Sequence, residues 1–267
     1  MRVCIGGATG GVGRCLVRAV LASNEFTLDG AVARKAAGAD AGEAIGEAPC
    51  GVIVSGDIDE ALARKPDVLI DYTHPDVRMK HVVAAISHGI PVVIGTTGFT
   101  AEQFEQLDAA ARDAGVGLAT GNFALTAALL QHFALFAAKH VPHWTVLDYG
   151  KASKPDVPSG TARELAELMG EIRRPKYELS TKQHLGEIES LGADVAGTRV
   201  HAVRLPGQTA STEVLFGMPG ERLSLRHEMG EDNSIFVNGS LLAARKVQEI
   251  TGLVRGLDRL LFDDVPG

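Results

Sequence analysis

The first 122 residues alternate short apolar runs with amphipathic segments. Continuous apolar runs of strand length cover residues 2–5, 27–33, 67–72, 91–95 and 116–120, with a weaker candidate at 52–54. Between these runs, apolar side chains recur at helical spacing, as in residues 12–21 and 101–114. Strands that alternate with helices are typical of a parallel sheet covered by helices. The pattern therefore predicts an α/β fold with an N-terminal Rossmann-type, doubly wound parallel sheet.

The pattern changes after residue 122. An apolar helix is predicted over 124–140, then a strand over 144–149 and a helix over 159–169. Three strands with short links follow, over 199–205, 211–216 and 222–227. Strands in series predict an antiparallel or mixed sheet, and hence a second α+β domain. Leu223 and Leu225 alternate with polar neighbours, which predicts that the last of these strands is half-buried.

The C-terminal residues are expected to return to the first domain. A helix is predicted over 240–250, and the apolar segment 253–262 follows it. We therefore expect one domain of residues 1–122 plus 239–267, and a second domain of residues 123–238.

A glycine triplet, Gly7-x-x-Gly10-x-x-Gly13, joins the first predicted strand to the first predicted helix. This is the context that a dinucleotide-binding loop requires. Gly7 would permit the tight turn, Gly10 the approach of a pyrophosphate, and Gly13 close packing of the helix on the sheet. A turn with a purely structural role is the alternative.

Arg34 and Lys35 follow the second predicted strand. A cofactor without a 2′-phosphate usually meets an acidic side chain here, whereas two cations suit the 2′-phosphate of NADP. The pair favours NADPH, with NADH as a weaker alternative. Two solvated cations at a strand end would give the same pattern.

Hydroxyl groups follow two further strands, at Tyr72-Thr73 and within Gly95-Thr96-Thr97-Gly98. Loops at the carboxyl ends of parallel strands line the ligand crevice, so these groups could bond a nicotinamide amide or a substrate acid. Ordinary turns would look the same. His74, His81 and His88 lack metal-ligand spacing, so we interpret them as surface or helix residues and expect no metal.

The stretch 151–163, KASKPDVPSGTAR, suggests a seat for an anion. Ser159, Gly160 and Thr161 open a predicted helix, whose free N–H groups and positive end attract a carboxylate or phosphate. Lys154 is close enough in sequence to add its ammonium group. A capped helix after a solvated basic loop is the alternative.

Composition narrows the class of protein. The net charge of −7 argues against nucleic acid or a membrane surface as a partner. Three cysteines without paired spacing indicate neither disulfides nor a zinc site. No apolar run approaches ~20 residues and no signal peptide is evident, so a cytoplasmic protein without a membrane span is expected.

Several motifs occur together in a fixed order. They are Gly7-x-x-Gly10-x-x-Gly13-Arg14, Asp71-Tyr72-Thr73-x-Pro75, Val93-Ile94-Gly95-Thr96-Thr97-Gly98-Phe99, Asn122-Phe123, Lys154-x-Asp156-x-Pro158-Ser159-Gly160-Thr161-Ala162, Gly220-Glu221-Arg222-Leu223 and Asn238-Gly239. With these motifs, the chain resembles the 4-hydroxy-tetrahydrodipicolinate (dihydrodipicolinate) reductase family of lysine and diaminopimelate biosynthesis. The resemblance implies an oxidoreductase that transfers hydride from NADPH or NADH to a cyclic unsaturated imino dicarboxylic acid. It also implies a homotetramer built through the sheet of the substrate-binding domain.

The resemblance also implies roles for individual residues. It places Gly7, Gly10, Gly11, Val12 and Gly13 at the pyrophosphate, and Arg34 and Lys35 at the adenosine ribose or its phosphate. It places Tyr72, Thr73, Gly95, Thr97, Asn122 and Phe123 around the nicotinamide. It assigns the substrate carboxylates to Thr97, Lys154, Ser159, Gly160 and Thr161.

The chain departs from the family where a histidine pair precedes the lysine. Gly150 stands at the position of the first histidine, the usual proton donor, and Lys151 at that of the second, which helps to bind substrate. The family also has an arginine where this chain has Leu242, with Arg245 three residues later. Two hypotheses follow. Either Lys154, Lys151, Tyr149 or water supplies the proton, or the chain is a paralogue with little or no activity on the family's substrate. Such a paralogue would reduce another cyclic imine or enone acid, or only bind ligand.

Overall fold

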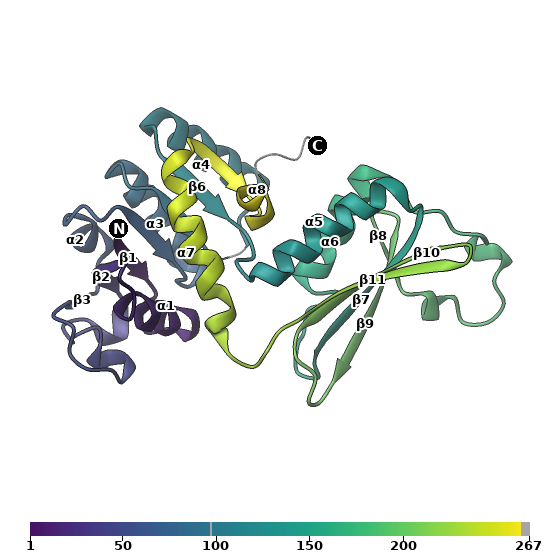
Figure 1. Cartoon of the computed structure of the whole chain (residues 1–267), viewed down its shortest axis with the longest axis horizontal. Helices are drawn as coiled ribbons and strands as arrows, with labels where there is room; N and C mark the ends of the chain where they lie inside the picture. The colour runs from purple at the N-terminus through teal and green to yellow at the C-terminus, as the bar shows by residue number, and fades with distance from the viewer. Residues whose placement is uncertain (97, 263–267) are drawn as a thin grey trace. The chain divides into compact units, whose positions relative to one another are not determined.

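The structure is a computed structural model that describes residues 1–96 and 98–262. The chain divides into two compact units (Figure 1). The first unit comprises Met1–Leu125 and Asn233–Gly267, and the second comprises Thr126–Asp232. We had expected the divisions after residues 122 and 238, a few residues from those observed.

The first unit contains a seven-stranded, all-parallel sheet in the order β12-β6-β5-β4-β1-β2-β3. Its strands are β1 (Arg2–Gly6), β2 (Thr27–Val32), β3 (Val54–Ser55), β4 (Val68–Asp71), β5 (Val92–Ile94), β6 (Gly117–Thr120) and β12 (Gly252–Arg255). Every residue of β4 and β5 is buried, as expected for parallel strands covered on both faces. The predicted Rossmann-type sheet is confirmed.

Helices form two layers on this sheet. The first unit contains α1 (Gly11–Leu21), α2 (Ile58–Leu62), α3 (Pro75–Ser87), α4 (Ala101–Ala114), α7 (Val237–Lys246) and α8 (Leu257–Leu261), with short 3₁₀ helices at Arg34–Ala36, Glu43–Ile45, Asn233–Phe236 and Val247–Glu249. Helices α2, α3 and α4 share one apolar cluster with the sheet, whereas α1 and α7 contact each other. Because β12 pairs with β6, the C-terminal segment returns to the first unit as predicted.

The second unit is a mixed sheet with two helices on one face (Figure 1). It contains α5 (Leu125–His140), β7 (His143–Lys151), α6 (Gly160–Ile172), β8 (Ala193–Val195), β9 (Thr198–Leu205), β10 (Ser211–Met218) and β11 (Glu221–Glu228), with 3₁₀ helices at Thr181–Gln183 and Ile188–Leu191. The strand order is β11-β10-β7-β9-β8, in which only the β7–β9 pair is parallel. The predicted α+β domain with a mixed sheet is confirmed.

Strand β7 shows how the second sheet is covered. Trp144, Val146 and Asp148 are buried and face the helices, while Tyr149 and its alternate neighbours are only partly buried. Side chains alternate between the two faces of a strand, so the second set lies on the opposite, open face of the sheet.

Two sequence predictions need correction. Strand β11 is less buried than predicted: Leu225 is partly buried against the core and His227 is buried, but Leu223 is 43% exposed. It is an edge strand with a neighbour on one side only. Helix α7 begins at Val237 rather than at residue 240. Gly239 lies inside it, where a methyl group would stand 2.0 Å from the Phe123 carbonyl oxygen, so glycine permits this close approach.

Candidate functional site

The loop between β1 and α1 is too crowded for side chains at two of its glycines. Gly7 has a positive φ of 75°, and a methyl group on it would lie 2.6 Å from the Tyr72 carbonyl oxygen. A methyl group on Gly13 would lie 2.0 Å from the Gly7 carbonyl oxygen. Glycine at position 7 therefore permits the tight turn, and glycine at position 13 permits the start of α1 to lie directly against the loop.

The first turn of α1 is suited to a phosphate. Gly10 caps the helix without a side-chain hydrogen bond, and no acidic residue lies in the first turn. The N–H groups of Gly11, Val12 and Gly13 therefore face no side-chain acceptor of the helix itself, and the helix dipole favours an anion there. The Asn233 side chain also reaches this point, because its Nδ2 would lie 2.7 Å from a methyl group on Gly11. No sequence pattern predicted Asn233 at this point, because it lies more than 200 residues away along the chain.

Arg34 and Lys35 lie in the 3₁₀ helix that directly follows β2. Both are exposed, and neither has an ion-pair partner among the residues that the structure describes. The two cations therefore stand free at the carboxyl end of a parallel strand, where the ligands of such sheets bind.

A buried carboxylate organises the loop after β4. Asp71 is fully buried and accepts hydrogen bonds from Thr73 Oγ1 at 2.8 Å. Its other oxygen lies 3.0 Å from His81 Nδ1. His81 is only 7% exposed, so it is not the surface residue that the sequence allowed but the partner of a buried acid. The hydroxyl of Thr73 is thus held by Asp71 rather than left free.

The Tyr72 ring packs against the loop that follows β5. A methyl group on Gly95 would lie 2.1 Å from Tyr72 Cζ, so the ring covers this glycine. The phenol is 2.8 Å from Ser240 Oγ, and burial raises the pKa of Tyr72 well above its usual value. Thr96 Oγ1 donates to the Thr73 carbonyl at 2.8 Å, which joins the two loops.

Arg78 is a further residue that the sequence analysis missed. It is 8% exposed, donates to the Gly98 carbonyl, and places its guanidinium carbon 4.4 Å from the centre of the Phe99 ring. It therefore fixes the end of the loop that follows β5. Thr97, which we expected to contact both nicotinamide and substrate, lies outside the described residues.

Asn122 and Phe123 follow β6, and their side chains lie in different environments. Asn122 Oδ1 accepts from the Ala124 N–H at 3.0 Å. Phe123 is 1% exposed, so its side chain is a core residue. Arg245 does not replace the arginine expected at position 242, because it is bound by both oxygens of Glu25 at 2.5 and 2.6 Å.

In the second unit, four residues form what we call the clamp: Lys154, Ser159, Gly160 and Thr161. Ser159 caps α6, and its hydroxyl accepts from the Ala162 N–H at 3.3 Å. Its own two donors are both used by buried Asp148, since the Ser159 N–H and hydroxyl lie 2.7 and 2.6 Å from the two carboxylate oxygens. Ser159 therefore uses its hydrogen-bonding groups to hold the start of α6, whereas Gly160 and Thr161 are exposed.

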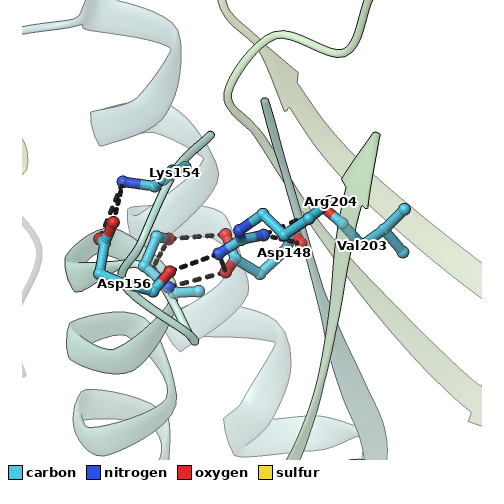
Figure 2. Close-up of polar contacts among 7 residues, drawn as sticks. Asp148, Lys154, Asp156, Val203 and Arg204 are labelled. Carbon is cyan, nitrogen blue, oxygen red and sulfur yellow. Dashed lines mark hydrogen bonds and ion pairs between the residues drawn. The ribbon is translucent and has the colours of Figure 1, made fainter. Parts of the chain in front are cut away.

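Lys154 is paired with an acid of the same loop. Its Nζ lies 2.8 and 2.7 Å from the two carboxylate oxygens of Asp156 (Figure 2). The pKa of Asp156 is lowered mainly by this ammonium group, with a smaller contribution from the Gly160 N–H. The carboxylate of Asp156 therefore already occupies the kind of environment that a substrate carboxylate would seek.

Lys154 also fills the space above Gly150. A methyl group on Gly150 would lie 3.0 Å from Lys154 Cδ and 3.3 Å from Arg204 Cδ and Cζ. The room in which a histidine at this position would begin is thus taken by one lysine and one arginine. Lys151 is exposed and has no ion-pair partner in the described part of the chain.

The structure contradicts Tyr149 as a neighbour of the clamp. Tyr149 points to the open face of the sheet, opposite to Asp148 and Gly150. Its phenol donates to Glu213 Oε2 at 3.2 Å, and Arg226 stacks over its ring. Burial, with a further effect from the Glu213 charge, raises the pKa of Tyr149. Strand alternation in 143–151 could have excluded this residue from the sequence alone.

Residues 1–96 and 98–262 contain no cluster of three or more histidine, cysteine, aspartate or glutamate side chains placed to hold a metal ion. Within the same described ranges, no helix has both the length and the apolar character needed to cross a membrane.

Comparisons with known proteins cover nearly all of the chain. The family model described as dihydrodipicolinate reductase, N-terminus, matches residues 1–123, and that described as dihydrodipicolinate reductase, C-terminus, matches residues 125–261. The 4-hydroxy-tetrahydrodipicolinate reductase of Synechococcus elongatus is 39% identical over 270 residues, covering 97% of this chain and 98% of the relative. That of Mycolicibacterium smegmatis is 40% identical over 263 residues, with 98% and 99% covered.

Two solved structures align with nearly the whole of this chain. The dipicolinate-bound dihydrodipicolinate reductase from Paenisporosarcina sp. TG-14 aligns with a TM-score of 0.84 at 32% identity, covering 97% of this chain and 98% of that one. GenD2 from gentamicin A biosynthesis, in complex with NAD, aligns with a TM-score of 0.65 over 98% of this chain and 90% of that one. At 15% identity, this second likeness shows the fold alone.

Proposed function

Because this chain belongs to the dihydrodipicolinate reductase family, we propose that it reduces 4-hydroxy-tetrahydrodipicolinate, or its dehydrated cyclic imine, in lysine and diaminopimelate biosynthesis. The family is nicotinamide-dependent, and the chain is an NAD(P)H-dependent oxidoreductase. The observation that carries the choice of substrate is the clamp: Lys154 and the start of α6 already hold the Asp156 carboxylate, so they suit a carboxylate of a dicarboxylic acid substrate.

The first unit has the features that a nicotinamide dinucleotide requires. The glycine loop is too crowded for side chains, and the first turn of α1 lacks both a side-chain cap and an acid. Gly7, Gly10, Gly11, Val12 and Gly13 would hold the pyrophosphate on backbone N–H groups. When bound, the cofactor supplies the hydride. Thr73, Gly95, Thr97 and Asn122 remain proposed contacts of the nicotinamide end, together with the backbone of Tyr72 and Phe123.

The second unit would bind the substrate and supply the proton. Gly160 and Thr161 offer N–H groups at the start of α6, and Lys154 offers a positive charge. We assign the proton to Lys154, because its side chain fills the space above Gly150 where the family's histidine would begin. For its ammonium group to act, it must exchange Asp156 for the substrate. Lys151 and water are the remaining alternatives.

The direct test is NADPH oxidation with freshly generated substrate. We expect turnover that depends on both substrate and enzyme, with competitive inhibition by dipicolinate. Retained NADPH binding without turnover above that in buffer would overturn the proposal. It would instead favour the paralogue that reduces another cyclic imine or enone acid, or only binds ligand, which the replacement of the histidine pair by Gly150 and Lys151 allows.

NADPH should bind more tightly than NADH. The exposed cations Arg34 and Lys35 are free to pair with a 2′-phosphate, and charge-assisted hydrogen bonds contribute about 1.5–3 kcal/mol. The double variant R34A/K35A is therefore expected to weaken NADPH binding by about 10- to 100-fold. NADH is the matched control ligand, and its dissociation constant should change by less than about threefold. Equal affinity of the unaltered protein for the two cofactors would contradict this assignment.

We also propose a cytoplasmic homotetramer formed through the open face of the second sheet. Leu205 and Leu215 lie on that face and are 54% and 39% exposed. Association would cover them, as burial of apolar surface favours. Light scattering on the purified protein would test this, since a monomer at micromolar concentration is incompatible with the proposal.

A further inference from the structure

Arg204 reaches across the second sheet beneath the clamp. It lies on β9 directly opposite Gly150 on β7, and its side chain is 14% exposed. Its Nη1 donates to the carbonyl oxygens of Asp148 and Val203 at 2.9 and 3.0 Å. Its Nη2 donates to Asp148 Oδ2 at 2.7 Å and to the Asp156 carbonyl at 2.8 Å (Figure 2).

These bonds connect two segments that are distant in sequence: β9, and the end of β7 with the loop that follows it. One guanidinium group holds the end of β7, the end of β9 and the loop that carries Lys154. The glycine at position 150 leaves the room for this crossing, because its missing side chain would point at Arg204. The planar fork of arginine suits several acceptors at once, whereas lysine offers a single point charge.

Arg204 acts on the clamp through Asp148. The Asp148 carboxylate accepts both donors of Ser159, the residue that caps α6. The position of the helix start, where the exposed residues Gly160 and Thr161 lie, thus depends on a carboxylate that Arg204 holds in place. Arg204 also balances the negative charge of Asp148, which would otherwise repel a dicarboxylate bound nearby.

One feature of this arrangement is costly for stability. The Nε of Arg204 is buried and has no hydrogen-bond partner among the described residues. A buried donor without a partner is unfavourable, and such groups are uncommon in folded proteins. The guanidinium group is therefore oriented so that its two Nη atoms donate four hydrogen bonds, while its Nε–H donates none within the described residues.

We propose that Arg204 is a positioning residue for the clamp, which fixes Asp148 and the loop carrying Lys154 so that substrate carboxylates meet a preformed seat. This inference rests on the proposed function, in which the clamp binds the carboxylates of the substrate. Arg204 itself does not contact the substrate. Misplacement of such a seat by about 1 Å can cost up to about 100-fold in rate.

The test compares three variants: R204M, R204K and the double variant D148N/R204M. We expect R204M and R204K to weaken dipicolinate binding at least tenfold, a loss within the range that a misplacement of about 1 Å can cause. Both variants should raise KM more than they lower kcat. Dissociation constants for dipicolinate and NADPH come from calorimetry, and thermal unfolding reports the fold. NADPH affinity, a property of the first unit, should stay within twofold in all three variants.

The double variant separates positioning from a merely structural role. It removes both charges, so no unpaired buried charge remains, and its thermal stability should exceed that of R204M. If Arg204 and Asp148 position the clamp together, dipicolinate affinity stays low in the double variant although stability returns. If affinity returns together with stability, the inference is overturned.

A matched control is R245M, which removes another arginine–carboxylate pair in the first unit. It should leave dipicolinate affinity within twofold of the unaltered protein. If R204M binds dipicolinate as the unaltered protein does, this inference fails alone. If the unaltered protein neither binds dipicolinate nor turns over substrate, the proposed function fails and the inference fails with it.

Discussion

Replacing Lys154 with arginine is expected to lower kcat by about 100-fold or more, in line with the contribution of a positioned general acid. Arginine keeps the positive charge that attracts a carboxylate, but it does not give up its proton near neutral pH. KM should therefore rise only a few-fold. Replacing Lys154 with methionine removes both the charge and the proton, so KM should rise as well. Steady-state kinetics with NADPH and fresh substrate measure both effects.

The second lysine of this loop, Lys151, provides the control for Lys154. The matched control is K151M, which removes an exposed lysine three residues away. If K151M loses kcat while K154R keeps it, the proton donor is Lys151 and the assignment made here is wrong.

Replacing Gly13 with alanine is expected to weaken NADPH binding strongly. The added methyl group would lie 2.0 Å from the Gly7 carbonyl oxygen and 2.7 Å from its carbon, so the helix start or the loop must move. Overpacking of this kind costs about 1–3 kcal/mol, equivalent to about 5- to 150-fold in an equilibrium constant. Fluorescence titration with NADPH measures the loss, and thermal unfolding shows how much of it is a loss of stability.

A control glycine makes the Gly13 result specific. Gly217 lies in β10, and a methyl group there would meet nothing within 4 Å. The variant G217A should therefore bind NADPH as the unaltered protein does. A G13A protein with unchanged NADPH affinity would show that the loop does not hold the pyrophosphate.

The sequence was sufficient for features that local chemistry determines. The glycine triplet, the order of strands and helices in the first unit, and the helix start at Ser159 all follow from patterns within about twenty residues. The apolar periodicity also located α4 at residues 101–114, the bounds that the structure has. Each of these features depends on backbone conformation or on burial of one face, which neighbouring residues largely decide.

The support of the clamp could not be predicted in this way. Arg204 and Asp148 are 56 residues apart, and only the parallel pairing of β7 with β9 brings them together. Nothing in the segment 198–205 indicates that one of its arginines is buried against a carboxylate. The same holds for Asp71 with His81 and for Asn233 at the start of α1, because side-chain pairing depends on register and not on periodicity.

The pairing of β12 with β6 has a consequence for how the chain is made. The second unit is inserted into the first, whose sheet is completed only by a strand near the C-terminus. A nascent chain that has reached residue 232 contains the whole second unit but lacks α7 and β12. Until β12 has been synthesised, one edge of β6 is unpaired, and an open strand edge is a point at which other chains can attach. The second unit is thus completely synthesised before the first unit can complete its sheet.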